Sequence, residues 1–448
     1  MTKYDFVAIG GGNAGLTAAS MAAAAGMRTA LVDGGPIGGL CSLNGCNPKK
    51  ALVRSTEVLD LIRHAEKFCI ETGPVKIDWP RVIDRKESFT KPVTPASEAS
   101  LKQQGIELLR AAPRFLEPHA MQVDGTNVEF GAALIATGST PRPLKFPGCD
   151  FTKTSNDILA LRKVPGELTI IGAGAIAFEF GQVFARLGSR VTILTPGKRA
   201  LKEFDADLVD ALLADCATLG ITLVPEAGVQ TVSRIGDKLR VEYQAGGEVR
   251  SLAADFVLNA AGRVPSISEL QLDQADVRFD RRGIMTNDFL RSVSNPDVFA
   301  AGDAHGRLQL SPIASYEGRV VGRNLVENDA ERVDYTSIPR ALYTIPQLAM
   351  VGMTDDEARS SGREFSVFTN DMSGWKVYAI AGEAPACAKI IVEKGSAKIL
   401  GAHLYNHSAA DQIHLFALAI KFGISADDLR RMVYAYPTLT SALAYTMG

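Results

Sequence analysis

Two cysteines, Cys41 and Cys46, lie five residues apart in the segment 38–50, which reads Gly-Gly-Leu-Cys-Ser-Leu-Asn-Gly-Cys-Asn-Pro-Lys-Lys. Gly45, between them, permits a tight turn that brings the two sulfur atoms together. Such a pair can alternate between a dithiol and a disulfide. Cysteines of soluble proteins more often serve as small buried apolar side chains, and a zinc site would require further Cys or His ligands at matched spacing. The surroundings of the pair decide between these alternatives.

A helix is predicted to begin directly after Cys46. Pro48 suits the first helical position and Asn47 suits the cap, and an apolar run follows them. Cys46 would then lie at a helix N-terminus, where the partial positive charge, together with Lys49 and Lys50, favours a thiolate over a thiol. We therefore expect Cys46 to be reactive.

The residues before the cysteines have the pattern of a dinucleotide-binding unit. A strand is predicted over 6–9 and an alanine-rich helix over 14–25. The turn between them carries glycines in GxGxxG spacing, Gly10, Gly12 and Gly15, which allow the backbone to approach a pyrophosphate at the helix N-terminus. Asp33 ends the next strand, over 29–32, where its carboxylate can accept hydrogen bonds from a ribose.

A second unit of the same kind begins at residue 168. A strand over 168–171 is followed by a glycine-rich turn and a helix to about residue 187, and the turn contains Gly172, Gly174 and Ala177. The next strand, over 191–194, ends without an acidic residue, and Lys198 and Arg199 follow it. Cations there would bind a 2′-phosphate, so NADPH is favoured over NADH, although a solvated basic loop is the alternative explanation.

The segment 38–50 resembles the GGTCLNVGCIPSK signature of the flavoprotein disulfide reductases, the family of glutathione reductase, dihydrolipoamide dehydrogenase and mercuric reductase. Four further motifs follow in the family's order: Ala-Thr-Gly-Ser at 136–139, the second glycine-rich turn, Ala-Ala-Gly-Arg at 260–263, and Gly-Asp at 302–303. The resemblance covers essentially the whole chain. Cofactor contacts are implied at matching positions, which are Gly39, Thr137, Gly138, Gly262, Gly302, Asp303 and Leu310.

The resemblance implies an α/β fold with two Rossmann-like dinucleotide-binding domains and a C-terminal α+β dimerisation domain. Residues 1–145 and 263–332 would bind FAD, residues 146–262 would bind NAD(P), and residues 333–448 would form a homodimer. Electrons would pass from NADPH through FAD to a Cys41–Cys46 disulfide and on to a small-molecule or protein disulfide. By position, Cys46 would adjoin the flavin and Cys41 would attack the substrate. Lys50 would pair with Glu179 near the flavin.

Three positions depart from the family's pattern. Ala175 replaces an aromatic residue that often covers the nicotinamide pocket, and Lys49 stands where Ser or Thr is usual. Most importantly, Tyr436 occupies the position of a histidine that relatives use as a base for the partner subunit's thiol. A tyrosine, with an ordinary pKa near 10, is a poor base at neutral pH. We therefore expect either a substrate that needs no proton, such as a disulfide of a low-pKa thiol or a thiol-bound metal ion, or a flavin-binding redox sensor or electron carrier with little turnover.

The composition is consistent with an ordinary globular protein. The chain has 448 residues, 46% of them hydrophobic, and a net charge of -2. The absence of a long basic run argues against nucleic acid or an anionic membrane as a partner. No signal peptide is recognisable, and six scattered cysteines suit a reducing cytoplasm, which is the expected location.

Overall fold

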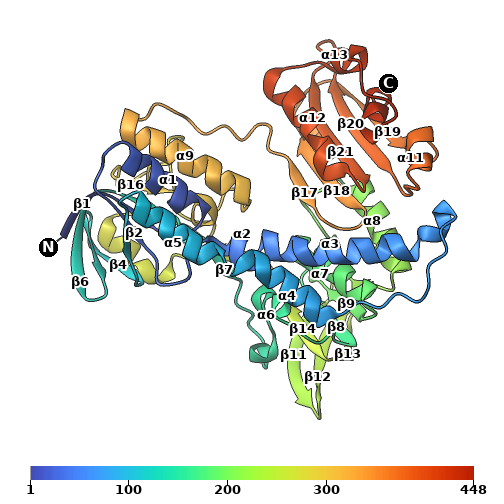
Figure 1. Ribbon diagram of the computed structural model, residues 1–448, viewed down its shortest axis with the longest axis horizontal. Helices are drawn as coiled ribbons and strands as arrows, with labels where there is room; N and C mark the ends of the chain where they lie inside the picture. The colour runs from blue at the N-terminus through green and yellow to red at the C-terminus, as the bar shows by residue number, and fades with distance from the viewer. Residues whose placement is uncertain (1, 448) are drawn as a thin grey trace.

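The computed structural model describes residues 2–447, and the three largest of its five sheets organise them (Figure 1). The first is a seven-stranded sheet in the order β3-β2-β1-β6-β5-β4, with β16 also paired to β6. Its strands are β1 (Thr2–Ile9), β2 (Thr29–Val32), β3 (Glu107–Leu109), β4 (Pro113–Glu117), β5 (Ala120–Val123), β6 (Thr126–Ile135) and β16 (Val298–Ala300). Helices α1 (Asn13–Ala24) and α9 (Ser311–Glu327) pack side by side at this sheet. The late strand β16 therefore returns the chain to the N-terminal sheet.

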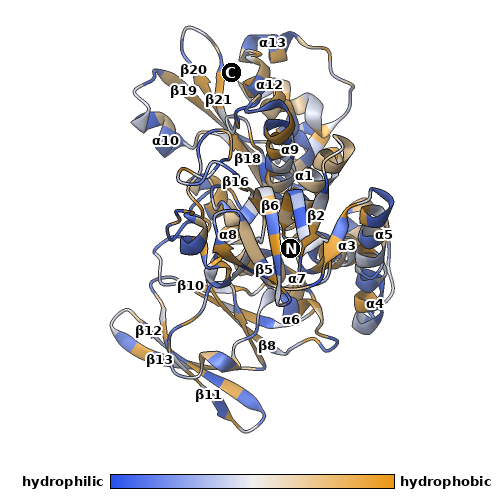
Figure 2. Ribbon diagram, turned by 90° about the vertical axis from the view of Figure 1, so that its left-hand side faces the viewer, coloured by the Kyte–Doolittle hydropathy of each residue, from blue (hydrophilic) through white to orange (hydrophobic). Residues whose placement is uncertain are grey.

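The second sheet is parallel and has the order β10-β9-β8-β14. Its strands are β8 (Glu167–Ile171), β9 (Arg190–Leu194), β10 (Thr222–Val224) and β14 (Phe256–Asn259), and its helices include α6 (Ser155–Leu159), α7 (Ala175–Arg186) and α8 (Ala206–Thr218). A three-stranded antiparallel sheet projects from it (Figure 2), formed by β11 (Gly228–Ile235), β12 (Lys238–Ala245) and β13 (Glu248–Ala254). The two connections to the first unit, β7 (Ser139–Pro141) and β15 (Arg263–Pro265), pair with each other.

The C-terminal unit is an antiparallel sheet in the order β17-β18-β21-β20-β19. Its strands are β17 (Arg340–Leu342), β18 (Gln347–Gly352), β19 (Phe365–Asp371), β20 (Cys387–Glu393) and β21 (Ile399–Asn406). Its helices are α10 (Asp355–Ser360), α11 (Lys376–Ile380), α12 (Ala409–Phe422) and α13 (Ala426–Arg431), of which α12 packs on β18 and β21. The expected α/β architecture with a separate α+β domain is confirmed, although strands β18 and β19 were not predicted from the sequence.

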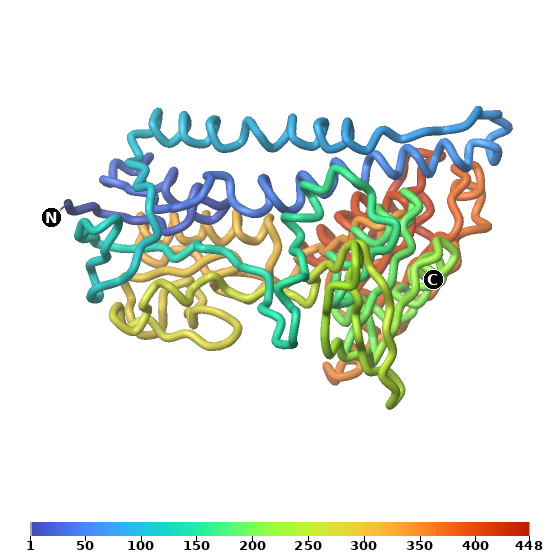
Figure 3. Tube along the Cα trace, turned by 90° about the horizontal axis from the view of Figure 1, so that it is seen from below, coloured from blue at the N-terminus to red at the C-terminus, as the bar shows by residue number. Residues whose placement is uncertain are grey.

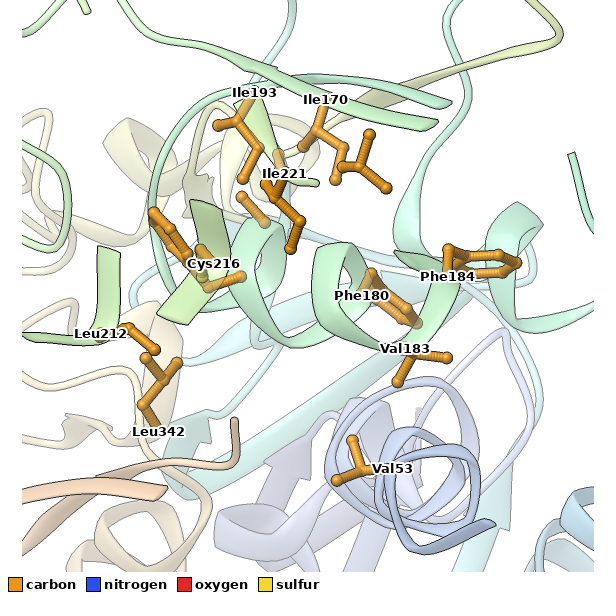
Figure 4. Packing of buried hydrophobic residues seen from close by; sticks show 14 of the residues in the cluster. Val53, Ile170, Phe180, Val183, Phe184, Ile193, Leu212, Cys216, Ile221 and Leu342 are labelled. Atoms are coloured by element: carbon orange, nitrogen blue, oxygen red, sulfur yellow. The ribbon is translucent and has the colours of Figure 1, made fainter. Parts of the chain in front are cut away.

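A row of helices joins the units. Figure 3 shows α4 (Trp79–Thr90) and α5 (Val93–Gln103) running along one side of the molecule, and α3 (Cys46–Arg63) contacts α4. Leu52 and Val53 of α3 are buried in a cluster with Phe180 and Val183 of α7 (Figure 4). This packing holds α3, the helix that begins at Cys46, against α7, which packs on the second sheet. Within residues 2–447, no helix combines the length and apolar character that crossing a membrane requires.

Candidate active site

The two cysteines lie on two separate helices. Cys41 belongs to α2 (Gly39–Asn44), and α3 begins at Cys46 itself, with Gly45 between the helices. The prediction that Asn47 caps the helix and that Pro48 is its first residue is therefore wrong. A Cβ atom at residue 45 would lie 2.7 Å from the carbonyl oxygen of Leu40, so only glycine fits this close turn, and the helix starts immediately after it.

The N-terminus of α3 points its hydrogen-bond donors at Cys41. The backbone N–H groups of Cys46 and Asn47, the hydroxyl of Ser311 and the thiol of Cys46 all donate to the Cys41 sulfur. The bond from Cys46 is the largest cause, and together these donors lower the pKa of Cys41 to about 6 against the opposing effect of burial.

The Cys46 thiol keeps its proton instead. Its hydrogen bond to Cys41 is the largest of the causes that raise its pKa, and burial adds to it, although Lys49 and Lys50 act in the opposite direction. These opposite directions favour a thiolate on Cys41 in the reduced pair. The expectation that Cys46 is the reactive thiolate stays a prediction, and the donors at the N-terminus of α3 favour Cys41 instead.

Glu179 of α7 is buried and meets both lysines that follow Cys46. Its Oε2 lies 2.5 Å from Lys49 Nζ, its Oε1 lies 3.6 Å from Lys50 Nζ, and Oε1 also accepts a 2.8 Å hydrogen bond from the backbone N–H of Tyr343. The structure thus brings Lys50 to Glu179 as expected, but Lys49 is the closer partner. Burial raises the pKa of Glu179, and the two lysines more than offset this, so that the net shift is downward. Burial also lowers the pKa of Lys50 to about 8.

The first glycine-rich turn is closely packed. A Cβ atom on Gly39 would lie 2.6 Å from the Cα atom of Gly12, so the approach of these two segments of backbone leaves no room for a side chain at residue 39. Asp33 at the end of β2 accepts 2.7 Å hydrogen bonds from the N–H groups of Gly11 and Gly35. Its carboxylate is thereby fixed beside the turn that also contains Gly10 and Gly15.

One cavity brings together both cysteines and five of the residues expected to contact the first cofactor. It is lined from the first turn, the cysteine pair, the segment after β6, the segment after β16 and the start of α9, and its lining includes Gly12, Gly39, Cys41, Cys46, Gly138, Gly302, Asp303 and Ser311. Leu310 is the N-cap residue of α9. Asp303 accepts a 2.6 Å hydrogen bond from Ser139 Oγ, and burial raises the pKa of Asp303. The cavity therefore lies between a helix N-terminus and both cysteines.

Polar groups around this cavity fit a flavin dinucleotide. The hydroxyl of Thr137 is buried and has no hydrogen-bond partner within residues 2–447, although a buried hydroxyl normally has one. The N-termini of α1 and α9 can bind anionic groups. Together with the glycine contact described above, these features accommodate FAD.

The second glycine-rich turn lies between β8 and α7. Gly172 has a φ of 109°, and its Cβ would meet the carbonyl oxygen of Ala260 at 2.2 Å, whereas a Cβ on Gly174 would meet no atom within 4 Å. Ala177 is buried within α7. Beyond β9, Lys198 and Arg199 are exposed, as a 2′-phosphate site or a solvated loop would require. Gly262, with a φ of 103°, follows β14.

Tyr436 does not line the cavity beside the cysteines of its own chain. It is 69% exposed on the C-terminal unit, where Val433 and Tyr445 are also exposed, by 96% and 75%. Ser441 donates its hydroxyl hydrogen bond to the carbonyl of Thr438, at 2.6 Å. Tyr436, at the position of the family's histidine base, thus lies on an exposed, partly apolar surface.

Comparison with known proteins identifies the family. The chain matches the pyridine nucleotide-disulphide oxidoreductases over residues 4–318 and the dimerisation domain of that family over residues 338–446. The chain belongs to this family. It is therefore an oxidoreductase of the FAD- and NAD(P)H-dependent kind that acts on sulfur groups, and it carries a dimerisation domain.

Two relatives illustrate the range of the family. A mercuric reductase of Bacillus cereus is 31% identical over 444 residues, which cover 98% of this chain and 70% of that protein. A dihydrolipoyl dehydrogenase of Bacillus subtilis (strain 168) is 32% identical over 452 residues, which cover 97% of this chain and 96% of that protein. Both kinds of enzyme were named in the resemblance.

Among solved structures, the HOCl-induced flavoprotein disulfide reductase RclA from Escherichia coli is similar, with a TM-score of 0.88, 26% identity and 99% of each chain covered. A Cu(II) complex of the same protein gives a TM-score of 0.90 at 26% identity, with 100% of this chain and 99% of that chain covered. The similarity extends over all three units of the fold.

Two supporting contacts in this oxidoreductase were missed from the sequence. Asn13 Nδ2 donates a 2.7 Å hydrogen bond to Ser311 Oγ and so orients the hydroxyl that donates to Cys41. Glu317 on α9, which is buried, accepts a 2.6 Å hydrogen bond from the backbone N–H of Gly302. No local pattern in the sequence marks Glu317 or shows that Ser311 reaches Cys41.

Proposed function

We propose that this protein uses NADPH and bound FAD to reduce thiol-bound soft metal ions, and disulfides whose thiols have low pKa values, through the Cys41–Cys46 pair. The observation that carries the proposal is the placement of Cys41 beside the N-terminus of α3 and Ser311, in a cavity whose described lining includes neither a histidine nor Tyr436. We assign FAD to residues 1–145 and 263–332, the nicotinamide nucleotide to 146–262, and the homodimer interface to 333–448. When bound, FAD supplies the two-electron transfer between NADPH and the pair.

The cysteines divide the thiol chemistry between them. The Cys41 thiolate attacks one sulfur of a substrate disulfide, which forms a mixed disulfide with Cys41 and releases the other sulfur as a thiolate. Cys46 then gives its proton to solvent, and its thiolate attacks the Cys41 sulfur, which restores the Cys41–Cys46 disulfide and releases the second thiolate. The described residues that line the cavity include no histidine to protonate the leaving sulfur, so the rate should favour thiols that leave as stable anions.

A thiol-bound metal ion avoids this difficulty, because its reduction requires no protonated leaving sulfur. The relatives support this substrate class, since they include mercuric reductases and since RclA is described in a Cu(II) complex. Lys50 and Glu179 would contribute charge beside the flavin, and Lys198 with Arg199 would select NADPH. In the homodimer the partner's Tyr436 would lie near Cys41, where its hydroxyl can donate a hydrogen bond but is a poor base near neutrality.

Steady-state NADPH oxidation at pH 7 tests the proposal. The panel contains Hg²⁺ and Cu²⁺ with excess low-molecular-weight thiol, an aromatic disulfide, oxidised glutathione, lipoamide and a quinone. We expect turnover with the metal ions and the aromatic disulfide, its loss in Cys41→Ser, and its retention in Cys149→Ser, which removes a cysteine outside the cavity.

Two outcomes contradict the proposal. Rapid reduction of oxidised glutathione, at a rate on the order of 10² s⁻¹, would mean that another group supplies the proton. Failure to oxidise NADPH with any member of the panel would favour the redox sensor or electron carrier instead.

A further inference from the structure

Three charged side chains meet behind the cysteine pair. Lys49 and Lys50 lie three and four residues after Cys46 on α3, so both share a helix face with it. Glu179 approaches from α7, and its side chain is only 3% exposed, compared with 15% for Lys49 and 30% for Lys50. Tyr343 adds a phenol ring over which the Lys50 ammonium lies.

The charges of this cluster do not cancel. One carboxylate faces two ammonium groups, and its shorter contact, at 2.5 Å, is to Lys49. Lys50, at 3.6 Å from the other oxygen, is left on the ring of Tyr343. Besides this lysine, Glu179 and Cys46, Tyr343 has a further charged neighbour, Asp411 of α12. The titratable group that faces Cys46 from α2 is Cys41. The cluster therefore carries one surplus positive charge next to the pair.

This surplus has an energetic consequence for the redox pair. Reduction of the disulfide takes up two electrons and one proton and leaves one thiolate and one thiol, so the pair gains a negative charge. A positive charge one helical turn away, in a partly buried site, stabilises that product more than it stabilises the neutral disulfide. The charges of both lysines also lower the pKa of the Cys46 thiol, although its net shift is upward. This effect likewise favours negative charge on the pair.

We propose that Lys49 is a positioning residue that raises the reduction potential of the Cys41–Cys46 pair, because it makes Glu179 share its single negative charge between two lysines and so leaves a net positive charge beside the sulfurs. This inference concerns the pair itself and holds for any substrate. A pair of one lysine and one glutamate would be neutral, so the second lysine is the source of the net positive charge.

The potential can be measured without turnover. The full-length FAD-containing protein is equilibrated at pH 7 in glutathione or dithiothreitol redox buffers, the free thiols are alkylated, and the disulfide fraction is obtained by mass spectrometry of the peptide that contains both cysteines. The variants are Lys49→Ser and Lys49→Met, which remove the charge, Lys49→Arg, which keeps it, and Lys67→Ser, which removes an exposed lysine of another segment.

Both charge-removing variants should shift the equilibrium about tenfold toward the disulfide, which corresponds to a potential about 30 mV lower for a two-electron couple. Lys49→Arg should stay close to the wild-type value and Lys67→Ser should equal it. The proposal fails if Lys49→Ser and Lys49→Met keep the wild-type potential. It also fails if Lys49→Arg shifts the potential as far as they do, because the effect would then be structural.

Discussion

Replacement of Ser311 by alanine should raise the pKa of Cys41. The pKa of Cys41 is lowered to about 6 by four donors, of which the Ser311 hydroxyl is one. A hydrogen bond to a charged group contributes about 1.5–3 kcal/mol, and the lower figure applies to a partly exposed sulfur. Since about 1.4 kcal/mol corresponds to one pKa unit, Ser311→Ala should raise the pKa by about one unit. At pH 6.5 the thiolate fraction would fall from about three-quarters to about one-quarter.

The assay is the alkylation rate of the reduced protein with iodoacetamide between pH 5 and 9, with peptide masses that separate Cys41 from Cys46. In the wild type the Cys41 rate should rise through pH 6 and level off above about pH 7, because the thiolate fraction increases with pH. Ser42→Ala, which changes a neighbouring hydroxyl on α2, is the matched control. An unchanged midpoint in Ser311→Ala, or faster alkylation of Cys46 than of Cys41 at pH 7, would refute the assignment of the thiolate.

Three further outcomes are expected. Gly39→Ala should yield protein with little bound FAD, measured by absorbance, because the new Cβ would lie 2.6 Å from the backbone of the facing glycine. Lys198→Glu combined with Arg199→Glu should reverse the NADPH to NADH preference in kcat/KM, and an unchanged ratio would show that the loop is only solvated. Tyr436→His should raise activity with oxidised glutathione by less than tenfold, far below the 10²- to 10⁴-fold that a positioned base provides, because the Ser441 hydroxyl is committed to a backbone carbonyl and cannot orient the imidazole.

The parts of the fold that the sequence predicted depend on short-range patterns. The first strand, helix and second strand were expected over 6–9, 14–25 and 29–32, and they are observed as β1, α1 and β2 with ends shifted by a few residues at most. Glycine spacing and alternation of apolar residues are local properties, so they can be recognised without knowledge of the tertiary structure. The same is true of the second turn and of strands β20 and β21.

The parts that were missed depend on distant contacts. Nothing near Lys49 shows that Glu179, 130 positions later, approaches it more closely than it approaches Lys50. The donor from Ser311 reaches Cys41 across 270 positions of sequence. The start of α3 was misplaced for a related reason, since the contact between Gly45 and Leu40 that determines it depends on α2, a helix that the sequence analysis did not predict.

The absence of a histidine base separates two tasks that one residue often performs. A base can deprotonate the attacking thiol and can also, as its conjugate acid, protonate the leaving sulfur. In this chain the subunit can meet the first task itself, because the N–H groups of α3 and the Ser311 hydroxyl lower the pKa of Cys41. The second task has no such provision among the described residues that line the cavity, because Tyr436 lies outside that lining and the Ser441 hydroxyl donates to the carbonyl of Thr438. We therefore expect substrate preference to depend on the leaving group rather than on the attacking thiol. This is the physical reason to look for substrates whose sulfur departs as a stable anion or remains bound to a metal ion.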